Sequence, residues 1–248
     1  MSLTVLSATF YKNMEPVVAL KNSCSRFGLS LVAYGIGKKF PGFYKAKVVK
    51  LLEALRKVET EYVLFCDGSD TVILKDEKTI VATYEKIVNS TGGEIVFGSD
   101  MKCFPYPLLT SVFEDRGKGY KASVCDWKGK KRRWVFLNAG VFMSTKRYLV
   151  QCLTRLMAMY SNDSKAVAHP EDDQGWWCMA IARGLVEVGI DYSVELSAMT
   201  KYTPDSWYSL SKGKCVQKPM NTEPCVLHFV GSKPMHRRMK GFLERMGL

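Results

Sequence analysis

Two carboxylates stand three residues apart in the turn Asp67-Gly68-Ser69-Asp70. This turn directly follows the apolar run YVLFC, which is typical of a strand buried on both faces. Carboxylate oxygens that lie this close together can converge on one hard divalent cation. Because Asp, Gly and Ser are also common in ordinary polar turns, the tetrapeptide alone leaves both interpretations open.

A second group of candidate ligands lies in the segment HFVGSK at 228–233. His228 ends an apolar run, and one of its ring nitrogens could bind a metal. Gly231 lets the backbone approach a phosphate, and Lys233 offers that phosphate a positive charge. Carboxylates combined with an imidazole suit Mn²⁺, with Mg²⁺ as the alternative. The alternative is that His228 is a half-buried histidine before a turn, with a structural role alone.

Two further motifs carry polar groups that could handle a sugar. In EDDQ at 171–174, Asp172 or Asp173 could accept the proton of an acceptor hydroxyl or bind sugar hydroxyls. Acidic residues at a helix start also stabilise the helix by themselves, because they face the positive end of its dipole. In LNAG at 137–140, Asn138 could bind sugar hydroxyls, with Gly140 leaving room for the sugar.

Alternating strand and helix patterns predict the scaffold that positions these groups. Such alternation indicates an α/β fold with a mixed, mostly parallel sheet flanked by helices. Ligands of such sheets bind outside the carboxyl ends of the strands, where the Asp67 turn is predicted to lie. The apolar patterns predict strands at 3–8, 29–34, 61–66, 94–98, 134–143 and 225–230, and helices at 17–27, 44–58, 79–88, 146–160, 173–183 and 234–246.

Length, composition and cysteine spacing indicate the size of the domain and the compartment in which the protein works. The 248 residues fit one α/β domain, and residues 101–133 read as a long loop that holds the basic cluster KGKKRR. The beginning lacks the pattern of a signal peptide, and no apolar run is long enough to span a membrane. The eight cysteines have no CxxC spacing, which favours reduced core cysteines over a zinc ribbon. We therefore expect a cytoplasmic protein that is neither secreted nor membrane-bound.

In their order along the chain, these motifs resemble those of GT-A (Rossmann-like) glycosyltransferases. The similarity is greatest to the glycosyltransferase domain of the procollagen lysyl hydroxylases and its phage and viral relatives. It rests on KVVKLLEAL, YVLFCDGSDTVIL, Cys103-Phe104-Pro105, FLNAGVFMS and EDDQ, and HFVGSKP is similar to an element of glycogenin-like transferases. The resemblance covers about 3–234. It departs at Ser69, because the family often has an aromatic residue in this turn that could stack on the donor's uracil or ribose.

The resemblance implies a single GT-A domain over 1–248, with a donor-binding half at about 1–100 and an acceptor-side half at about 101–248. It also implies that a UDP-sugar is the donor. The implied metal ligands are Asp67, Asp70 and His228, and Asp67 also contacts the donor. The implied donor contacts are Ala8 and Thr9 for the base and Lys47 and Lys233 for the phosphates, while Asn138, Asp172 and Asp173 match sugar-binding and catalytic positions.

The acceptor is predicted from charge. A formal net charge of +12 favours an anionic partner, and DNA affinity comes largely from phosphate contacts. We therefore expect a hydroxylated or hydroxymethylated pyrimidine in DNA, which the enzyme would flip out of the duplex. Four tryptophans, Trp127, Trp134, Trp176 and Trp177, are candidate stacking surfaces. The acceptor contacts predicted in this way are Lys130, Lys131, Arg132, Arg133, Trp176, Arg237 and Arg238.

Other readings stay open. Hydroxylysine in a collagen-like protein is the acceptor that the family resemblance implies. A basic nucleic-acid-binding domain without activity would make the acidic motifs turns and caps, but it leaves their joint order unexplained. A metal-dependent nuclease or phosphatase would act on DNA without any nucleotide sugar.

Overall fold

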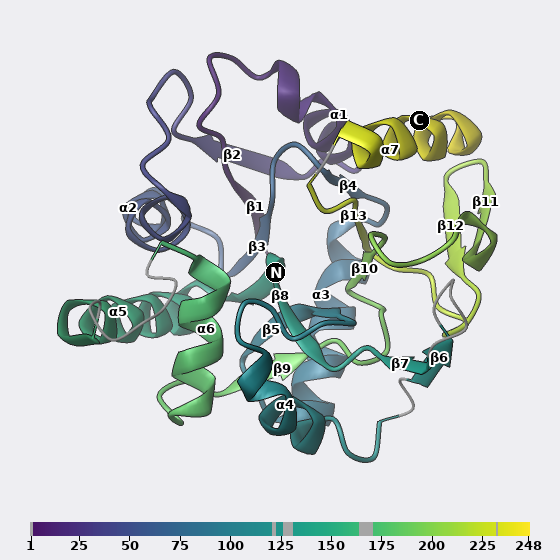
Figure 1. Cartoon of the computed structure of the whole chain (residues 1–248). Helices are drawn as coiled ribbons and strands as arrows, with labels where there is room; N and C mark the ends of the chain where they lie inside the picture. Colours follow the sequence, from purple (N-terminus) through teal and green to yellow (C-terminus); the bar gives the residue numbers. More distant parts are fainter. Residues whose placement is uncertain (1, 121–122, 126–130, 164–170, 232) are drawn as a thin grey trace.

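The computed structural model describes residues 2–120, 123–125, 131–163, 171–231 and 233–248. A six-stranded sheet in the order β2-β1-β3-β8-β5-β9 forms its centre (Figure 1). All strands run in one direction except β8, which is antiparallel to both neighbours. The strands are β1 Leu3–Ala8, β2 Ser30–Tyr34, β3 Tyr62–Cys66, β5 Ile95–Asp100, β8 Phe136–Thr145 and β9 Val188–Ile190. The predicted fold class, a mixed and mostly parallel α/β sheet, is confirmed.

Helices cover both faces of this sheet, which explains why its inner strand β3 is apolar and buried along its whole length. Within β3, Val63 and Phe65 belong to one core, and Leu64 belongs to the other. The first core receives α2 Lys50–Leu55, α5 Lys146–Asp163 and α6 Asp173–Ala182, and the second receives α1 Val18–Arg26 and α3 Glu77–Thr91. The predicted strands and helices are all present, with ends shifted by a few residues.

A smaller sheet in the order β10-β13-β4 lies beside the central one. Its strands are β10 Ser197–Met199, β13 Val226–His228 and β4 Thr71–Ile73. The chain ends in α7 Lys233–Met246, close to the hairpin of β11 Tyr208–Ser211 and β12 Lys214–Gln217. A further two-stranded pair joins β6 Ser123–Cys125 to β7 Lys131–Arg133.

Two segments differ from the sequence-based expectation. The predicted loop at 101–133 contains α4 Thr110–Arg116 as well as β6 and β7, so it is partly regular. The predicted helix at 44–58 is divided, because a π-helical turn, η2 Lys45–Val49, precedes α2. The remaining 3-10 turns are η1 Glu15–Val17, η3 Pro107–Leu109 and η4 Asp205–Trp207.

None of the helices in the described ranges combines the length and the apolar character that crossing a bilayer requires. The central sheet takes strands from both predicted halves of the chain, β1, β2, β3 and β5 from 1–100 and β8 and β9 from 101–248. The seven cysteines whose side chains are described are all free, and six of them are buried.

Candidate active site

The turn after β3 presents Asp67 and Asp70 at the carboxyl edge of the central sheet. The backbone N–H of Asp67 donates to the carbonyl of Gly140 in β8 at 2.8 Å, which fixes the start of the turn. Asp70 is 7% exposed, and the N–H of Gly231 donates to its Oδ2 at 3.0 Å. Both carboxylates are thus held by neighbouring strands and loops before any ligand binds.

His228 reaches this turn through strand pairing. Because β13 runs antiparallel to β4, His228 lies opposite Thr71, the residue that follows Asp70. Its Nε2 lies 3.8 Å from Oδ2 of Asp67 and 3.8 Å from Oδ2 of Asp70. The structure therefore brings together the three residues predicted as metal ligands, with one ligand atom from each within 4.8 Å of the others.

The chemistry of this cluster fits a divalent cation. His228 is 2% exposed, and neither of its ring nitrogens has a hydrogen-bond partner among the described residues. A buried polar nitrogen without a partner is costly, and a metal ion bound to Nε2 would satisfy it. Two carboxylates and one imidazole are a ligand set for Mn²⁺ or Mg²⁺ that leaves coordination positions for a substrate.

Gly140 leaves the space that this cluster needs. A Cβ atom at position 140 would lie 2.1 Å from Cε1 of His228 and 2.8 Å from Oδ2 of Asp67. Both distances are shorter than real contacts of a Cβ atom. The glycine of the LNAG motif is therefore explained by the close approach of β8 to the imidazole and the carboxylate.

Lys47 links the cluster to the EDDQ motif. Its Nζ lies 2.9 Å from Oδ1 of Asp67 and 3.6 Å from Oδ2 of Asp173, and the residue is buried. Burial alone lowers the pKa of Lys47, but the carboxylates of Asp173 and Asp67 raise it overall, so the side chain stays charged. The predicted phosphate-binding lysine thus pairs with two carboxylates in this structure.

The two aspartates of EDDQ have different environments. Asp172 is the N-cap of α6, and its Oδ1 accepts from the N–H of Gly175 at 2.7 Å. Asp173 is 5% exposed and faces Lys47, and its burial raises its pKa to about 6, although Lys47 opposes this shift. Asp172 therefore fulfils the helix-capping role, while Asp173 places an ionisable group inside the site.

Asn138 lies beside two residues whose roles the sequence did not reveal. Its Nδ2 is 3.5 Å from Oδ2 of Asp100, a buried carboxylate at the end of β5. The side chain of Gln174 accepts from the N–H of Ala139 at 2.9 Å and donates to the carbonyl of Phe104 at 2.9 Å. The position of Asp100 after the apolar run EIVFG was a usable signal, because a polar residue at a strand end marks the same edge of the sheet.

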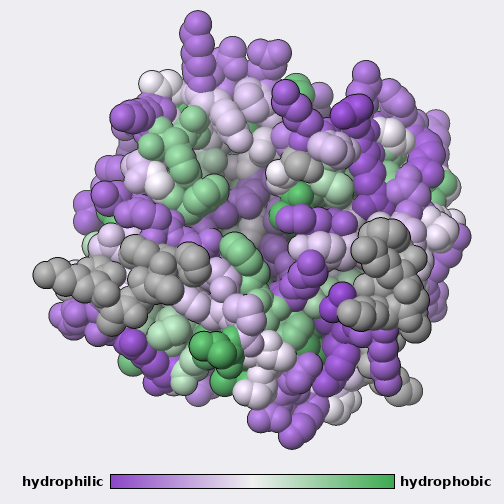
Figure 2. Space-filling view, viewed as in Figure 1, coloured by the Kyte–Doolittle hydropathy of each residue, from purple (hydrophilic) through white to green (hydrophobic). Residues whose placement is uncertain are grey.

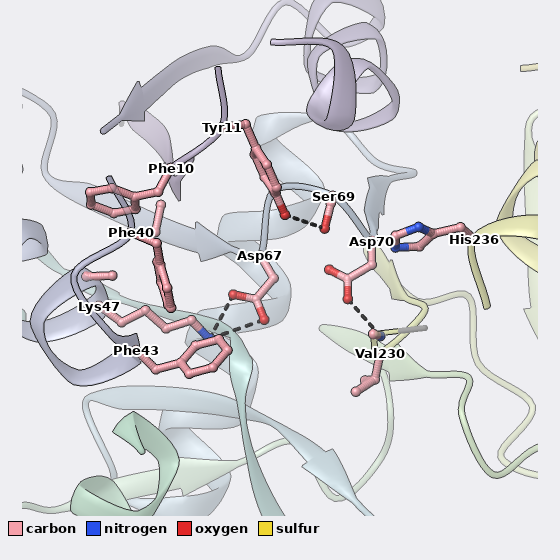
Figure 3. Close-up of a pocket in the computed structure, with 14 residues that line it drawn as sticks. Phe10, Tyr11, Phe40, Phe43, Lys47, Asp67, Ser69, Asp70, Val230 and His236 are labelled. Carbon is pink, nitrogen blue, oxygen red and sulfur yellow. Dashed lines mark hydrogen bonds and ion pairs between the residues drawn. The ribbon is translucent and has the colours of Figure 1, made fainter. Parts of the chain in front are cut away.

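Two cavities meet at the cluster, and Figure 2 shows this face of the molecule hollowed near its centre with hydrophilic side chains inside. The first cavity, of about 630 Å³, contains Asp70 and Gly231, and the second, of about 510 Å³, contains Asn138 and Asp173. Both are lined by Phe43, Lys47, Asp67 and Val230 (Figure 3). The cluster thus stands between two spaces, each large enough for part of a substrate.

The first cavity also has an aromatic wall that sequence reasoning missed, made of Phe10, Tyr11, Phe40 and Phe43. Of the predicted donor contacts, Ala8 lines this cavity, whereas Thr9 is fully buried and does not. Lys233 is exposed at the start of α7 and is not part of the lining, which instead includes His236 one turn later.

Several predicted acceptor contacts lie elsewhere. Trp176 is fully buried against Tyr44 and Tyr160, so its predicted contact with an acceptor is wrong. Trp134 and Trp177 are also fully buried, because the apolar runs that contain them form the core, and Trp127 and Lys130 lie outside the described residues. The three predicted stacking residues that the structure describes, Trp134, Trp176 and Trp177, are therefore not available to a base.

The basic residues predicted to contact the acceptor also differ in their positions. Arg238 pairs with Asp205, with its Nε 2.7 Å from Oδ1, and its guanidinium lies over the ring of Tyr208, so it anchors α7 to the body of the protein. Arg237 is exposed on the same helix. Three residues of β7, Lys131, Arg132 and Arg133, line a shallow cavity together with Lys102, which also borders the second cavity.

The fold is that of known GT-A glycosyltransferases. The chain is similar to a crystal structure of a glycosyltransferase involved in the glycosylation of the major capsid of PBCV-1, with a TM-score of 0.57 and 13% identity over 97% of this chain and 100% of that one. It also aligns with S. aureus TarS 1–349 at 14% identity over 77% of this chain and 58% of that one, but the TM-score of 0.40 is too low to support an argument. The protein is therefore of the GT-A class.

The family follows from the sequence itself. Residues 2–178 match the family described as the PLOD GT domain, the glycosyltransferase domain of the procollagen lysyl hydroxylases. The chain belongs to this family and is a glycosyltransferase. The matched range contains both aspartates of the turn and the EDDQ motif, and it ends before β13 and His228. No curated protein sequence gives a significant match.

Proposed function

We propose that the protein transfers a sugar from a UDP-sugar to an acceptor hydroxyl, using Asp67, Asp70 and His228 to hold Mn²⁺ or Mg²⁺. The observation that supports this most directly is the buried imidazole of His228, whose ring nitrogens have no partner among the described residues although Nε2 points at two carboxylates. A bound divalent ion supplies positive charge that stabilises the diphosphate leaving group. Membership of a glycosyltransferase family makes the nuclease and the inactive binding domain poorer explanations.

The two cavities suggest how the substrates are divided. The nucleotide occupies the first cavity, with its base near Ala8 and its phosphates near Asp70 and Gly231. Lys233 lies two residues after Gly231 and adds positive charge near the phosphates. The sugar and the acceptor occupy the second cavity. Lys47 borders both spaces and is charged, so it can exchange a carboxylate partner for a phosphate oxygen.

The second cavity provides the groups that would orient the sugar. Asn138 and Gln174 offer amide hydrogens and oxygens, and Asp173 offers a carboxylate beside Lys47. With a pKa of about 6, Asp173 is mostly ionised at neutral pH, so it can accept a hydrogen bond or a proton from a hydroxyl group. Asp172 supports this arrangement by capping the helix that carries Asp173.

For the acceptor, we propose a hydroxyl group on a protein side chain, of the hydroxylysine type. Family membership supports this choice, and the burial of Trp134, Trp176 and Trp177 removes surfaces that a flipped DNA base would have used. A hydroxymethylated pyrimidine in DNA stays the second candidate. It is favoured by the basic side chains of Lys102 and Lys201 at the second cavity and of β7 beside it. The free cysteines fit a reducing compartment such as the cytoplasm.

A mass-shift assay tests this proposal. The enzyme is incubated with Mn²⁺ and a panel of UDP-sugars, and hydroxylysine peptide and hydroxymethylpyrimidine DNA are offered side by side. We expect a sugar increment on the peptide, and an increment on the digested nucleoside alone would replace the first acceptor by the second. If the enzyme modifies neither acceptor and also hydrolyses none of the UDP-sugars, the proposed function is contradicted.

A further inference from the structure

The shallow cavity beside β7, of about 670 Å³, continues outward from the second cavity, and we call it the basic groove. Among the described residues, its lining holds one acidic side chain, Glu114, and four basic ones. The basic residues are Lys102, Lys131, Arg132 and Arg133. Lys102 and Pro107 line both spaces. A molecule whose hydroxyl group enters the second cavity can therefore continue over the basic groove.

Hydrogen bonds to the backbone hold the walls of the basic groove. Oδ1 of Asp100 accepts from the N–H of Lys102 at 2.9 Å, which fixes the segment that follows β5. Nη2 of Arg133 donates to the carbonyl of Gly117 at 2.7 Å, which joins β7 to the end of α4. The walls are thus in place before a partner binds, which limits the ordering that binding requires.

Three exposed lysines at the basic groove and the mouth of the second cavity have no carboxylate partner. The Nζ atoms of Lys102 and Lys201 lie 4.3 Å and 5.6 Å from the ring centroid of Tyr202, so two ammonium groups gather about one ring. Neither lysine, nor Lys131 in β7, forms an ion pair within the part of the chain that the structure describes. These charges are therefore available to an anionic partner.

The neighbours of these lysines favour a peptide over a nucleic acid. A nucleic-acid backbone carries a charge at every nucleotide, so it would bring phosphates against Glu114. Phe104 lines the second cavity and is 58% exposed, and Leu108, directly after Pro107, is 95% exposed. A peptide can place separate carboxylates on the lysines and apolar side chains on Phe104 and Leu108, whereas a phosphate backbone offers only the first kind of contact.

We propose that the basic groove binds carboxylate side chains that flank the acceptor hydroxyl in a protein substrate, so that the enzyme prefers acidic acceptor segments. The inference rests on the proposed function, because it assumes that the acceptor hydroxyl enters the second cavity. Exposed charges of this kind contribute more to specificity and to the rate of association than to affinity, and salt weakens them. The preference is therefore expected to be moderate at low salt and to fall as salt is added.

Fluorescence anisotropy with labelled peptides, in the presence of Mn²⁺ and UDP, tests the inference without turnover. Three hydroxylysine peptides of equal length carry Glu, Gln or Lys at the flanking positions. The wild type is expected to bind the Glu peptide about three- to thirtyfold more tightly than the Gln peptide. In Lys102→Glu combined with Lys131→Glu, the order is expected to reverse, so that the Lys peptide binds most tightly. The matched control is Lys21→Glu, at an exposed position in α1, and it is expected to keep the preference of the wild type.

The outcomes separate the inference from the proposed function, because UDP binding is measured on the same proteins. A wild type that does not bind UDP with Mn²⁺ overturns the proposed function, and the inference with it. If UDP binds, equal affinity for the Glu and Gln peptides, or a double variant that still prefers the Glu peptide, overturns the inference alone.

A duplex DNA of similar length distinguishes the other class of partner. If the double variant loses affinity for the DNA but keeps that for the Glu peptide, the basic groove serves nucleic acid and the inference is overturned. Thermal melting checks the folding of each variant, and Lys131→Glu alone replaces the double variant if the latter is unfolded. The single variant is expected to lose part of the preference for the Glu peptide, and an unchanged preference would also overturn the inference.

Discussion

At the scale of single residues, the candidate site depends on the room left beside Gly140 as much as on the side chains that could bind an ion. Asp67, Asp70 and His228 are side chains that a sequence can suggest, because carboxylates and imidazoles are known metal ligands. The need for glycine at position 140 is visible only in three dimensions, because it comes from the approach of β8 to His228. The geometry of the proposed cation site thus depends on a residue that contributes no ligand atom.

Gly140→Ala is expected to weaken Mn²⁺ binding about five- to a hundredfold, because the added methyl group must displace His228 or Asp67 at a cost of about 1–3 kcal/mol. The amount of free Mn²⁺ in an electron paramagnetic resonance titration measures this change. Gly241→Ala is the matched control, because a Cβ at this position of α7 has no atom within 4 Å. The control is expected to keep the affinity of the wild type, and equal affinities for all three proteins would contradict the proposed placement of the ion.

Asp100 gives a prediction about pH. Burial raises its pKa to about 6, against hydrogen bonds from Lys102 and Asn138 that lower it, whereas the unfolded chain has a value near 3.8. Because the folded pKa is the higher one, this contribution to stability is fully present below about pH 4 and is lost as the pH rises through 6. The wild type is therefore expected to lose unfolding free energy between pH 4 and 7. Asp100→Asn is expected to lose about 1–3 kcal/mol less over the same range.

Urea unfolding of both proteins without divalent cations, at several pH values in this range, measures the effect. Asp173 and Asp191 also have pKa values of about 6, so part of the pH dependence is expected to persist in Asp100→Asn. Identical pH profiles for the wild type and the variant would show that Asp100 does not titrate in this range.

At the scale of elements, we propose that the two aspartates at the start of α6, which both line the second cavity, have different roles. Asp172→Ala removes the N-cap and is expected to lower the unfolding free energy by about 1 kcal/mol. Asp173→Asn keeps the shape of a side chain whose raised pKa already favours a neutral group, so its stability is expected to stay close to that of the wild type. Its transfer activity is expected to fall at least about tenfold, because the carboxylate beside Lys47 is lost.

Thermal melts and initial rates of UDP-sugar turnover, measured side by side, test this separation. Full activity in Asp173→Asn would show that the carboxylate of Asp173 does not take part in transfer. An unchanged melting temperature in Asp172→Ala would contradict the capping role.

The pairing of elements explains what could be predicted from sequence and what could not. The long apolar patterns of β3 and α5 and the motifs at strand ends are local, and they predicted the sheet, most helices and the cluster of candidate residues. The pairing of β4 with β13 joins segments about 155 residues apart through three-residue strands, which have no periodicity to read. The aromatic wall was missed for the same reason, because Phe10 and Tyr11 come close to Phe40 and Phe43 only through the fold.

At the scale of the whole molecule, the formal charge of +12 does not by itself identify the acceptor. Part of that charge is used inside the protein, since Lys47 pairs with buried carboxylates and Arg238 anchors α7. The tryptophans predicted to stack on bases are core residues where the structure describes them. Net charge describes a surface field and does not distinguish the residues that form it from those that stabilise the fold.

We propose that this glycosyltransferase binds a nucleotide through a divalent cation at the cluster of Asp67, Asp70 and His228. Calorimetric titration of UDP with and without Mn²⁺ tests it most directly, on the wild type, on Asp70→Ala and on Asp115→Ala, an exposed acidic control in α4. We expect Mn²⁺-dependent binding by the wild type and the control, and a loss of affinity of at least about tenfold in Asp70→Ala. UDP binding that is independent of Mn²⁺, or unchanged in Asp70→Ala, would contradict it.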